Sequence, residues 1–323
     1  MINIKEKTGI AVAGTILVDE INEIKKYPNS GELTQIVKVS KSVGGCVPNV
    51  AIDLKKICPD IKVSAIGKVG DDENGKYVLD TFFDNGVDTS GIVEEKGSVT
   101  SFTEVMSVIN GQRTFFTYPG ASANFGFSDI DFEKLDSRIL HLGYFLLLEK
   151  VDNGDGLLIL KKAKEMGVET SIDLVSENSN RYSLVHPCLP FTDYLIVNEI
   201  EAGKLAGMEP NDQNLELIAN KLRELGVRKK VIIHMPKKSV CLSDSGYTCA
   251  YSCELPKGYI KGTTGAGDAF CAGALIGIYK GFSDEGILKF GEACAIMALS
   301  TADATSGLKC EADVKENYAK FNK

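Results

Sequence analysis

The sequence has no tryptophan and only three histidines, and none of its apolar runs approaches the ~18 residues of a membrane-spanning helix. Its nine cysteines form neither a CxxC pair nor a short cluster with histidine. The cysteine count is odd, and the N-terminal residues Met1 to Lys7 alternate in charge without an apolar stretch. These features favour a reduced, cytoplasmic setting over secretion, and we expect no contact with a membrane.

Clustered basic charge is also missing. The formal net charge is −8 and the isoelectric point is about 5.1. A sequence-independent grip on nucleic acid or on an anionic membrane needs many lysines and arginines on one face, so we expect neither partner. The total charge still leaves room for a small, local anion site.

The composition is that of an ordinary globular protein. Of its 323 residues, 44% are hydrophobic, 25% are charged and 32 are glycines, which is a mild excess. The length alone allows either two domains or one large α/β domain with an appendage. Glycine is common where a backbone approaches a ligand, although tight turns also use it.

Short apolar runs alternate with amphipathic helical patterns through the chain. This alternation predicts right-handed βαβ units in a doubly wound, mostly parallel sheet with helices on both faces. The runs expected as strands are residues 9–13, 61–66, 138–142, 169–174, 194–197 and 231–235. The segments expected as helices are residues 48–57, 74–85, 156–166, 215–225, 266–279 and 284–301.

Two segments, Leu33 to Ser40 and Phe102 to Tyr118, interrupt this alternation. Both are rich in β-branched or aromatic residues, and the second contains an Asn110-Gly111 turn. We expect them to form a small projecting sheet. The pattern alone does not distinguish a lid over a site from an ordinary extension of the sheet edge.

The most informative stretch is GTTGAGDAF, from Gly262 to Phe270. Two glycines and two threonines precede a long apolar helix, whose first backbone N–H groups and positive dipole end favour an anion. Asp268, in the first turn, can either pair with the helix dipole or deprotonate a hydroxyl beside a bound phosphate. A purely structural turn is the competing interpretation.

Other signatures of nucleotide or acyl chemistry are missing. The sequence has no GxxxxGK[ST] motif, no GxGxxG after its first strand and no GxSxG. His141, His186 and His234 are far apart in the sequence, and for each of them we expect a structural role.

Several motifs resemble those of one family in the same order. Gly262 to Gly273 (GTTGAGDAFCAG) and Val43 to Ala51 (VGGCVPNVA) are similar to the two signatures of the PfkB, or ribokinase-like, carbohydrate kinases. Further similar segments are 14–19 (GTILVD), 67–72 (GKVGDD), 86–88 (GVD) and 198–201 (NEIE). The resemblance covers almost the whole chain.

The resemblance implies an ATP-dependent sugar kinase, which phosphorylates a hydroxyl group of a small sugar or sugar-like substrate. Asp268 would be the catalytic base, and the backbone N–H groups of Gly265, Ala266 and Gly267 would stabilise the transferring phosphoryl group.

It also implies the other site residues. The sugar would be bound by Asp19, Gly44, Gly45 and Asn49. ATP and Mg²⁺ would be bound by Asn198, Glu201, Thr264, Gly265 and Gly267, with Glu201 acting on the metal through water. From the residues alone, the preferred interpretation is a helix that starts after a strand, with Asn198 as its cap.

The family resemblance also gives the small sheet a role. A single ribokinase-like domain would span residues 1–323, with a lid formed by about residues 15–42 and 98–120. Because an uncovered sheet edge attracts a partner, we expect a homodimer formed through the lid. Phe102, Phe116 and Tyr118 would either line the sugar side or pack within the lid.

Two positions depart from the family pattern. Gly262 stands where the family usually has an aspartate that helps to hold a monovalent cation, so activation by such a cation is doubtful. Pro236 follows a strand where the family has a glycine turn near the nucleotide, so the adenine side must be built differently. Lys237, Lys238 and Arg113 would either meet anionic groups or remain solvated. A nucleoside kinase of the same family, a kinase with another nucleotide and a non-catalytic sugar or nucleotide sensor are the alternatives.

Overall fold

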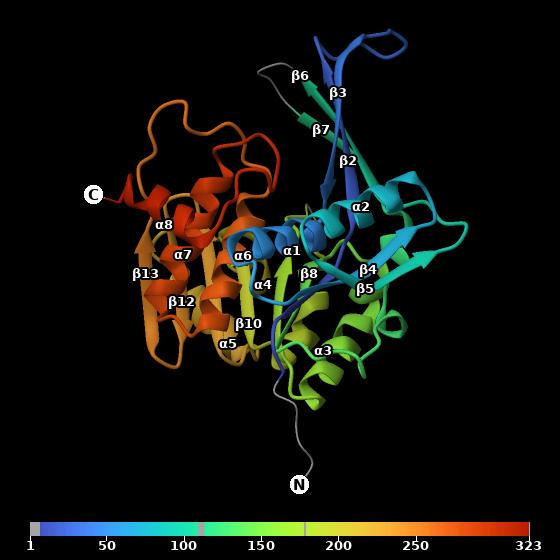
Figure 1. The fold of residues 1–323 in the computed structure, drawn as a ribbon. Helices are drawn as coiled ribbons and strands as arrows, with labels where there is room; N and C mark the ends of the chain where they lie inside the picture. Colours follow the sequence, from blue (N-terminus) through green and yellow to red (C-terminus); the bar gives the residue numbers. More distant parts are fainter. Residues whose placement is uncertain (1–6, 109–112, 178, 323) are drawn as a thin grey trace.

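A computed structural model describes residues 7–108, 113–177 and 179–322 (Figure 1). The large sheet has nine strands in the order β13-β12-β11-β10-β9-β8-β1-β4-β5. The pairs from β11 to β5 are parallel, and β12 and β13 add two antiparallel strands at one edge. These nine strands are β1 Ile10–Gly14, β4 Val63–Gly70, β5 Asp88–Glu95, β8 Ile139–Phe145, β9 Glu169–Leu174, β10 Tyr194–Asn198, β11 Lys230–Met235, β12 Lys238–Ser243 and β13 Gly246–Tyr251.

Helices cover both faces of this sheet, and each face has its own hydrophobic core (Figure 1). One core contains residues of α1 Cys46–Ile57, α2 Glu73–Asp84, α6 Ala266–Lys280, α7 Asp284–Ala298 and α8 Glu311–Ala319. The other contains residues of α3 Gly156–Glu165, α4 Glu199–Ala206, α5 Leu215–Glu224 and the 3₁₀ segment Arg181–Phe191. The central strands are therefore buried on both sides, which explains their continuous apolar runs.

The expected fold class is confirmed. The sequence patterns predicted strands β1, β4, β8, β9, β10 and β11 and six of the helices, whereas they missed β5, β12, β13 and α8 and gave α4 only as the capping interpretation of Asn198. Among the described residues, no helix is both long and apolar enough to cross a membrane.

A smaller sheet of four strands projects from the main domain (Figure 1). Its order is β3-β2-β6-β7, with bounds β2 Leu17–Ile24, β3 Ile36–Gly44, β6 Phe102–Val108 and β7 Arg113–Tyr118. Strands β6 and β7 pair antiparallel, as expected for a hairpin. The Asn110-Gly111 turn lies outside the described residues. The role of this sheet as a lid stays a prediction.

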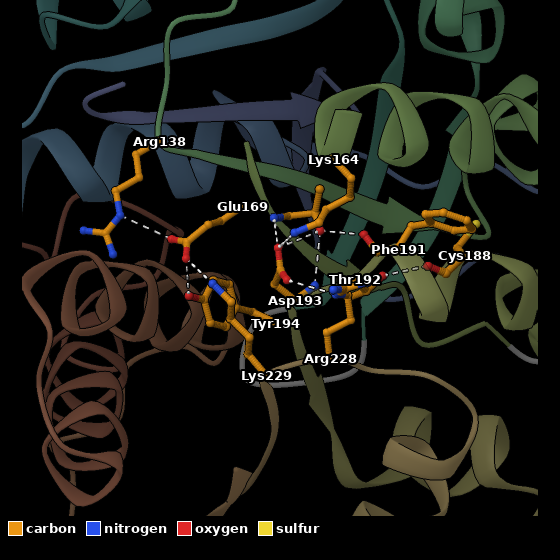
Figure 2. A network of polar contacts seen from close by, with 11 residues as sticks. Arg138, Lys164, Glu169, Cys188, Phe191, Thr192, Asp193, Tyr194, Arg228 and Lys229 are labelled. Atoms are coloured by element: carbon orange, nitrogen blue, oxygen red, sulfur yellow. Dashed lines mark hydrogen bonds and ion pairs between the residues drawn. The ribbon is translucent and has the colours of Figure 1, made fainter. Parts of the chain in front are cut away.

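The amino ends of the central strands are fixed by paired charges (Figure 2). Asp193, just before β10, accepts hydrogen bonds from Lys164 Nζ at 2.6 Å and from the backbone N–H of Thr170 at 2.9 Å. Glu169 pairs with Arg138 and Lys229. These buried or half-buried carboxylates have cationic partners from neighbouring elements, so their contacts stabilise the fold. We call this end of the parallel strands the amino edge of the sheet.

Candidate active site

Asp268 lies in the first turn of α6, at the carboxyl ends of the parallel strands. We call this end of the strands the carboxyl edge of the sheet. Gly265 caps this helix with φ of +75°, and a Cβ at this position would lie 2.5 Å from the Cβ of Ala304. Both features require glycine here. The turn leaves the first N–H groups of α6 at the site, although the Ala266 N–H also donates to the Thr263 carbonyl at 3.3 Å. We call residues 262–267 the anion loop.

The Asp268 carboxylate is almost fully buried and is held from two sides. Asn49 Nδ2 donates to Asp268 Oδ2 at 2.8 Å, and the Tyr144 hydroxyl lies 3.1 and 3.0 Å from Oδ1 and Oδ2. Burial, reinforced by the negative charges of Asp173 and Asp19, raises the pKa of Asp268 to about 7, although the two hydrogen bonds oppose the shift. A carboxyl group with this pKa is well suited to accept a proton near neutral pH.

The four residues expected to bind sugar lie around the start of α1, beside Asp268. Gly45 caps α1 with φ of +87°, and a Cβ on Gly44 would lie only 2.4 Å from Asp19 Oδ2. Burial raises the pKa of Asp19 to about 6. In the part of the chain that the structure describes, Asn49 Oδ1 is buried and has no hydrogen-bond partner. Asp19 and Asn49 therefore offer carboxylate and amide oxygens beside the glycine backbone at 44–45.

A polar cavity of about 210 Å³ opens beside Asp268. Its walls include Asp173 from β9, Asn198 and Glu201 from the start of α4, and Gly265 and Gly267 from the anion loop. The structure thus brings together the expected catalytic and nucleotide-binding residues, except that Thr264 and Ala266 do not line this cavity.

Asn198 and Glu201 form a reciprocal cap at the start of α4. Asn198 Oδ1 accepts the Glu201 N–H at 2.9 Å, and Glu201 Oε2 accepts the Asn198 N–H at 3.1 Å. The capping interpretation of Asn198 is therefore correct, and it also fixes both side chains at the cavity. Burial, with a smaller contribution from the charge of Asp173, raises the pKa of Glu201 to about 7.

A second, mostly apolar cavity of about 620 Å³ adjoins the first and shares Asn198, His234 and Gly267 with it. Met235 and Pro236, at the end of β11, line it from one side. Further lining residues come from the anion loop, α6, α7 and the segment after β13: Thr263, Ala266, Phe270, Ile296, Leu299, Leu255 and Ile260. The unusual Pro236 is thus part of a cavity wall.

The three histidines differ in their surroundings. His141 lies behind the site, with Nδ1 3.0 Å from Ser171 Oγ, and His186 Nε2 lies 2.9 Å from the Leu205 carbonyl. His234, for which we expected only a structural role, stacks on Phe270 at 4.8 Å and lines both cavities. Burial lowers the pKa of His234 to about 4, so its ring is neutral at the site.

Sequence reasoning missed Tyr144, because it lies 124 positions from Asp268 and no motif marks it. Its φ of +59° is unusual for a residue with a side chain, and its N–H donates to Asp173 Oδ1 at 2.6 Å. A strained residue beside a buried acid is typical of functional sites.

Three charged residues considered from the sequence fall in different places. Arg113, at the start of β7, donates from Nη1 to Thr264 Oγ1 at 3.0 Å, which places the small sheet beside the anion loop. Lys237 is exposed, and Lys238 pairs with Asp212 at 3.5 Å. Gly262 packs against the 301–302 backbone, where a Cβ would lie 2.9 Å from the Ala302 carbonyl oxygen.

Comparison with known proteins identifies the family of this chain. Residues 7–310 match the model of the pfkB family carbohydrate kinases. A ribokinase of Arabidopsis thaliana is 26% identical over 91% of this chain and 77% of its own, and a probable chloroplastic fructokinase of the same plant is 28% identical over 87% and 75%.

Solved structures show the same fold. The structure of Arabidopsis thaliana ribokinase complexed with ribose and ATP superposes with a TM-score of 0.84 at 23% identity, covering 97% of this chain and 99% of that one. Since the family match spans nearly the whole chain and includes both motifs at the site, the protein belongs to the pfkB family of carbohydrate kinases, phosphotransferases that act on sugar hydroxyl groups.

Proposed function

We propose that this kinase transfers the γ-phosphoryl group of ATP to a hydroxyl of a small sugar, with Asp268 as the general base. The observation that carries the proposal is the position of Asp268. It lies between a group of sugar-type ligands at the start of α1 and the anion loop at the start of α6. A base there can take the proton of a hydroxyl while the hydroxyl oxygen attacks a phosphorus atom held by the loop.

The sugar side is built for directional hydrogen bonds. Asp19 and the free Oδ1 of Asn49 accept hydrogen bonds from sugar hydroxyl groups, and the backbone at Gly44 and Gly45 lets the substrate approach closely. A site of this kind discriminates among hydroxyl arrangements, because a mismatched sugar leaves a buried acceptor unpaired.

The nucleotide side extends from the polar cavity into the apolar one. The apolar cavity takes the base of the nucleotide, between Pro236 and Phe270, and the anion loop with Thr264 takes the phosphates. Arg113 reaches the loop from the small sheet and adds a positive charge beside the phosphates. Gly265 and Gly267 leave their N–H groups accessible to the transferring group.

Magnesium fits the donors of the polar cavity. Glu201 and Asp173 are two carboxylates that line the same cavity, and the charge of Asp173 contributes to the raised pKa of Glu201. A cation bound between them would offset this repulsion. Glu201 and Asn198 would hold the ion through water. When bound, Mg²⁺ would supply positive charge that stabilises the negative charge of the phosphates during transfer.

The small sheet, with the adjoining residues 15–42 and 98–120, would act as a lid that excludes water from the transfer. The contact of Arg113 with Thr264 supports a closed arrangement. Strands β3 and β7 expose Val37, Val39, Phe115 and Phe116, so we also propose a homodimer in which two lids cover each other. All nine cysteines are free, which supports a reducing, cytoplasmic location.

The test is a screen of pentoses, hexoses, sugar acids and nucleosides, in which ADP release is coupled to a spectrophotometric readout and thermal shift reports binding. We expect one sugar class to give ATP- and magnesium-dependent turnover. Turnover with nucleosides alone would identify a nucleoside, rather than a sugar, as the substrate. Binding of a sugar without turnover, with either ATP or GTP, would contradict the kinase proposal and indicate a sensor.

A further inference from the structure

Two buried polar side chains in the wall of the apolar cavity have an oxygen atom that is free to meet a ligand. Glu292 is in α7 and Ser239 is in β12, and their exposed fractions are 5% and 3%. Both line the cavity of about 620 Å³ in which we place the base of the nucleotide. Within the described ranges 7–108, 113–177 and 179–322, neither Glu292 Oε2 nor Ser239 Oγ has a hydrogen-bond partner. An unpaired polar atom that is buried in this way is costly, so a ligand group that pairs with it gains affinity.

Glu292 is a charged residue on an otherwise apolar face of α7. Ala295, Ile296 and Leu299 follow it at helical spacing and line the same cavity. Among the residues that the structure describes, no lysine or arginine contributes to the pKa shift of Glu292. A carboxylate in such surroundings needs hydrogen-bond donors, because burial of an unpaired charge is expensive.

The structural contact of Glu292 uses only one of its oxygens. Oε1 accepts the Cys253 N–H at 2.9 Å, which holds the segment after β13 against α7. A glutamine would make the same contact without a charge, so this contact does not explain the carboxylate or the free Oε2. Burial raises the pKa of Glu292, although the Cys253 N–H and the nearby Ser252 hydroxyl oppose the shift.

The hydrogen-bonding pattern of these two groups matches one edge of adenine. A carboxylate oxygen only accepts hydrogen bonds, whereas a hydroxyl can also donate. Adenine presents an amino group at position 6 beside a ring nitrogen that accepts. Guanine and hypoxanthine have a carbonyl oxygen at position 6, which a carboxylate repels. The two adjacent N–H donors of guanine would need both carboxylate oxygens, and Oε1 is already engaged with Cys253.

We propose that Glu292 selects adenine nucleotides, with Oε2 accepting a hydrogen bond from the 6-amino group of the base and the Ser239 hydroxyl donating to a ring nitrogen. The inference rests on the proposed function, since it requires that this cavity holds the base. Pro236 in the cavity wall has no N–H to offer the base, so side chains supply polar contacts that the turn at this position does not. Glu292 is thus a specificity residue, remote from the transferred phosphoryl group.

The first test is nucleotide binding to the full-length protein, measured by calorimetry with magnesium and without sugar. We expect ADP to bind at least about 30-fold more tightly than IDP or GDP, because both of these have a carbonyl group at position 6. This comparison uses wild-type protein and does not depend on the folding of a variant. Affinities for ADP and IDP within twofold of each other would overturn the proposal.

The second test is Glu292→Gln, which keeps the acceptor for the Cys253 N–H. The ratio of ADP to IDP affinity should fall below about threefold, because the amide can donate to the 6-carbonyl of IDP. Glu285→Gln on the same helix is the matched control, since Glu285 pairs with Lys289 at the exposed surface, and its ratio should equal that of wild type. A structural defect would weaken both nucleotides alike. An unchanged ratio in folded Glu292→Gln would contradict the proposal.

The outcomes separate this inference from the proposed function. Selective binding of ADP by a protein that phosphorylates no sugar would contradict the kinase proposal and support the role of Glu292. Equal binding of ADP and IDP by a protein that phosphorylates a sugar would contradict only the role of Glu292. A protein that binds none of the three nucleotides would overturn both.

Discussion

Buried carboxylates have cationic partners at the amino edge of the large sheet and lack them at the carboxyl edge. At the amino edge, Asp193 is completely buried but lies 2.6 Å from Lys164, and Glu169 has its own cationic partners (Figure 2). At the carboxyl edge, within the described residues, no lysine or arginine contributes to the pKa shifts of Asp19, Glu201 or Asp268. Their pKa values rise to about 6 or 7 instead.

This difference separates structure from chemistry. Paired charges stabilise the folded chain and leave nothing free to react. Unpaired carboxylates are costly to bury, and they become useful only when a cation, a hydroxyl group or a phosphate enters. Mutations at the amino edge should therefore lower the stability of the protein, and mutations at the carboxyl edge should lower its turnover.

The largest expected effect is the loss of the base. Asp268→Asn should lower kcat at least about 100-fold, because the amide cannot accept the hydroxyl proton. ATP binding, measured by calorimetry, should change little. A variant with wild-type turnover would show that the carboxyl edge does not supply the base.

At the amino edge, Lys164→Met should destabilise the protein by about 2 kcal/mol, since it leaves the buried Asp193 without its nearest cation. Denaturant unfolding measures this change. Lys162→Met on the same helix is the matched control, because its pair with Glu165 at 3.8 Å is exposed to solvent. The comparison of edges fails if Lys164→Met lowers kcat in folded protein while leaving stability unchanged.

Asp268→Asn should also stabilise the protein at alkaline pH. The pKa of Asp268 rises from 3.8 to about 7 on folding, so ionisation of this carboxyl destabilises the folded state as pH increases from about 4 to 7. The variant should melt a few degrees above wild type at pH 8, with a smaller gain at pH 5. The exposed Asp84→Asn is the control, and a gain that is independent of pH would contradict the assigned cause.

The smallest expected effect concerns the small sheet. Arg113→Ala should raise the KM for ATP about fivefold, because an exposed charge contributes on the order of 1 kcal/mol. Arg113→Lys should recover part of the loss, and Lys38→Ala on β3 should change nothing. An unchanged KM in Arg113→Ala would mean that the contact with Thr264 does not reach the phosphates.

The sequence predicted those parts of the site that local patterns encode. Gly265 and Asp268 lie at a helix start that the motif marks, and the apolar runs mark six of the parallel strands. Tyr144 was missed because its contact with Asp268 depends on how two distant elements pack. The position of His234 in the walls of both cavities was missed for the same reason.

Elements with weak patterns were also missed. Helix α8 buries only Val314, so its sequence carries no clear apolar face. Strands β12 and β13 are a short antiparallel addition at the edge of a parallel sheet, and no helix separates them as the repeated βαβ pattern requires.

The central claim is that Asp268, unpaired with any cation and with its pKa raised to about 7, is the base of the reaction. The most direct test is the pH dependence of kcat/KM for the sugar identified in the screen, at saturating ATP and magnesium, between pH 5.5 and 8.5. The account predicts a tenfold rise per pH unit on the acid side and a plateau above about pH 7. A profile that is flat across this range, in protein shown to remain folded, would contradict it.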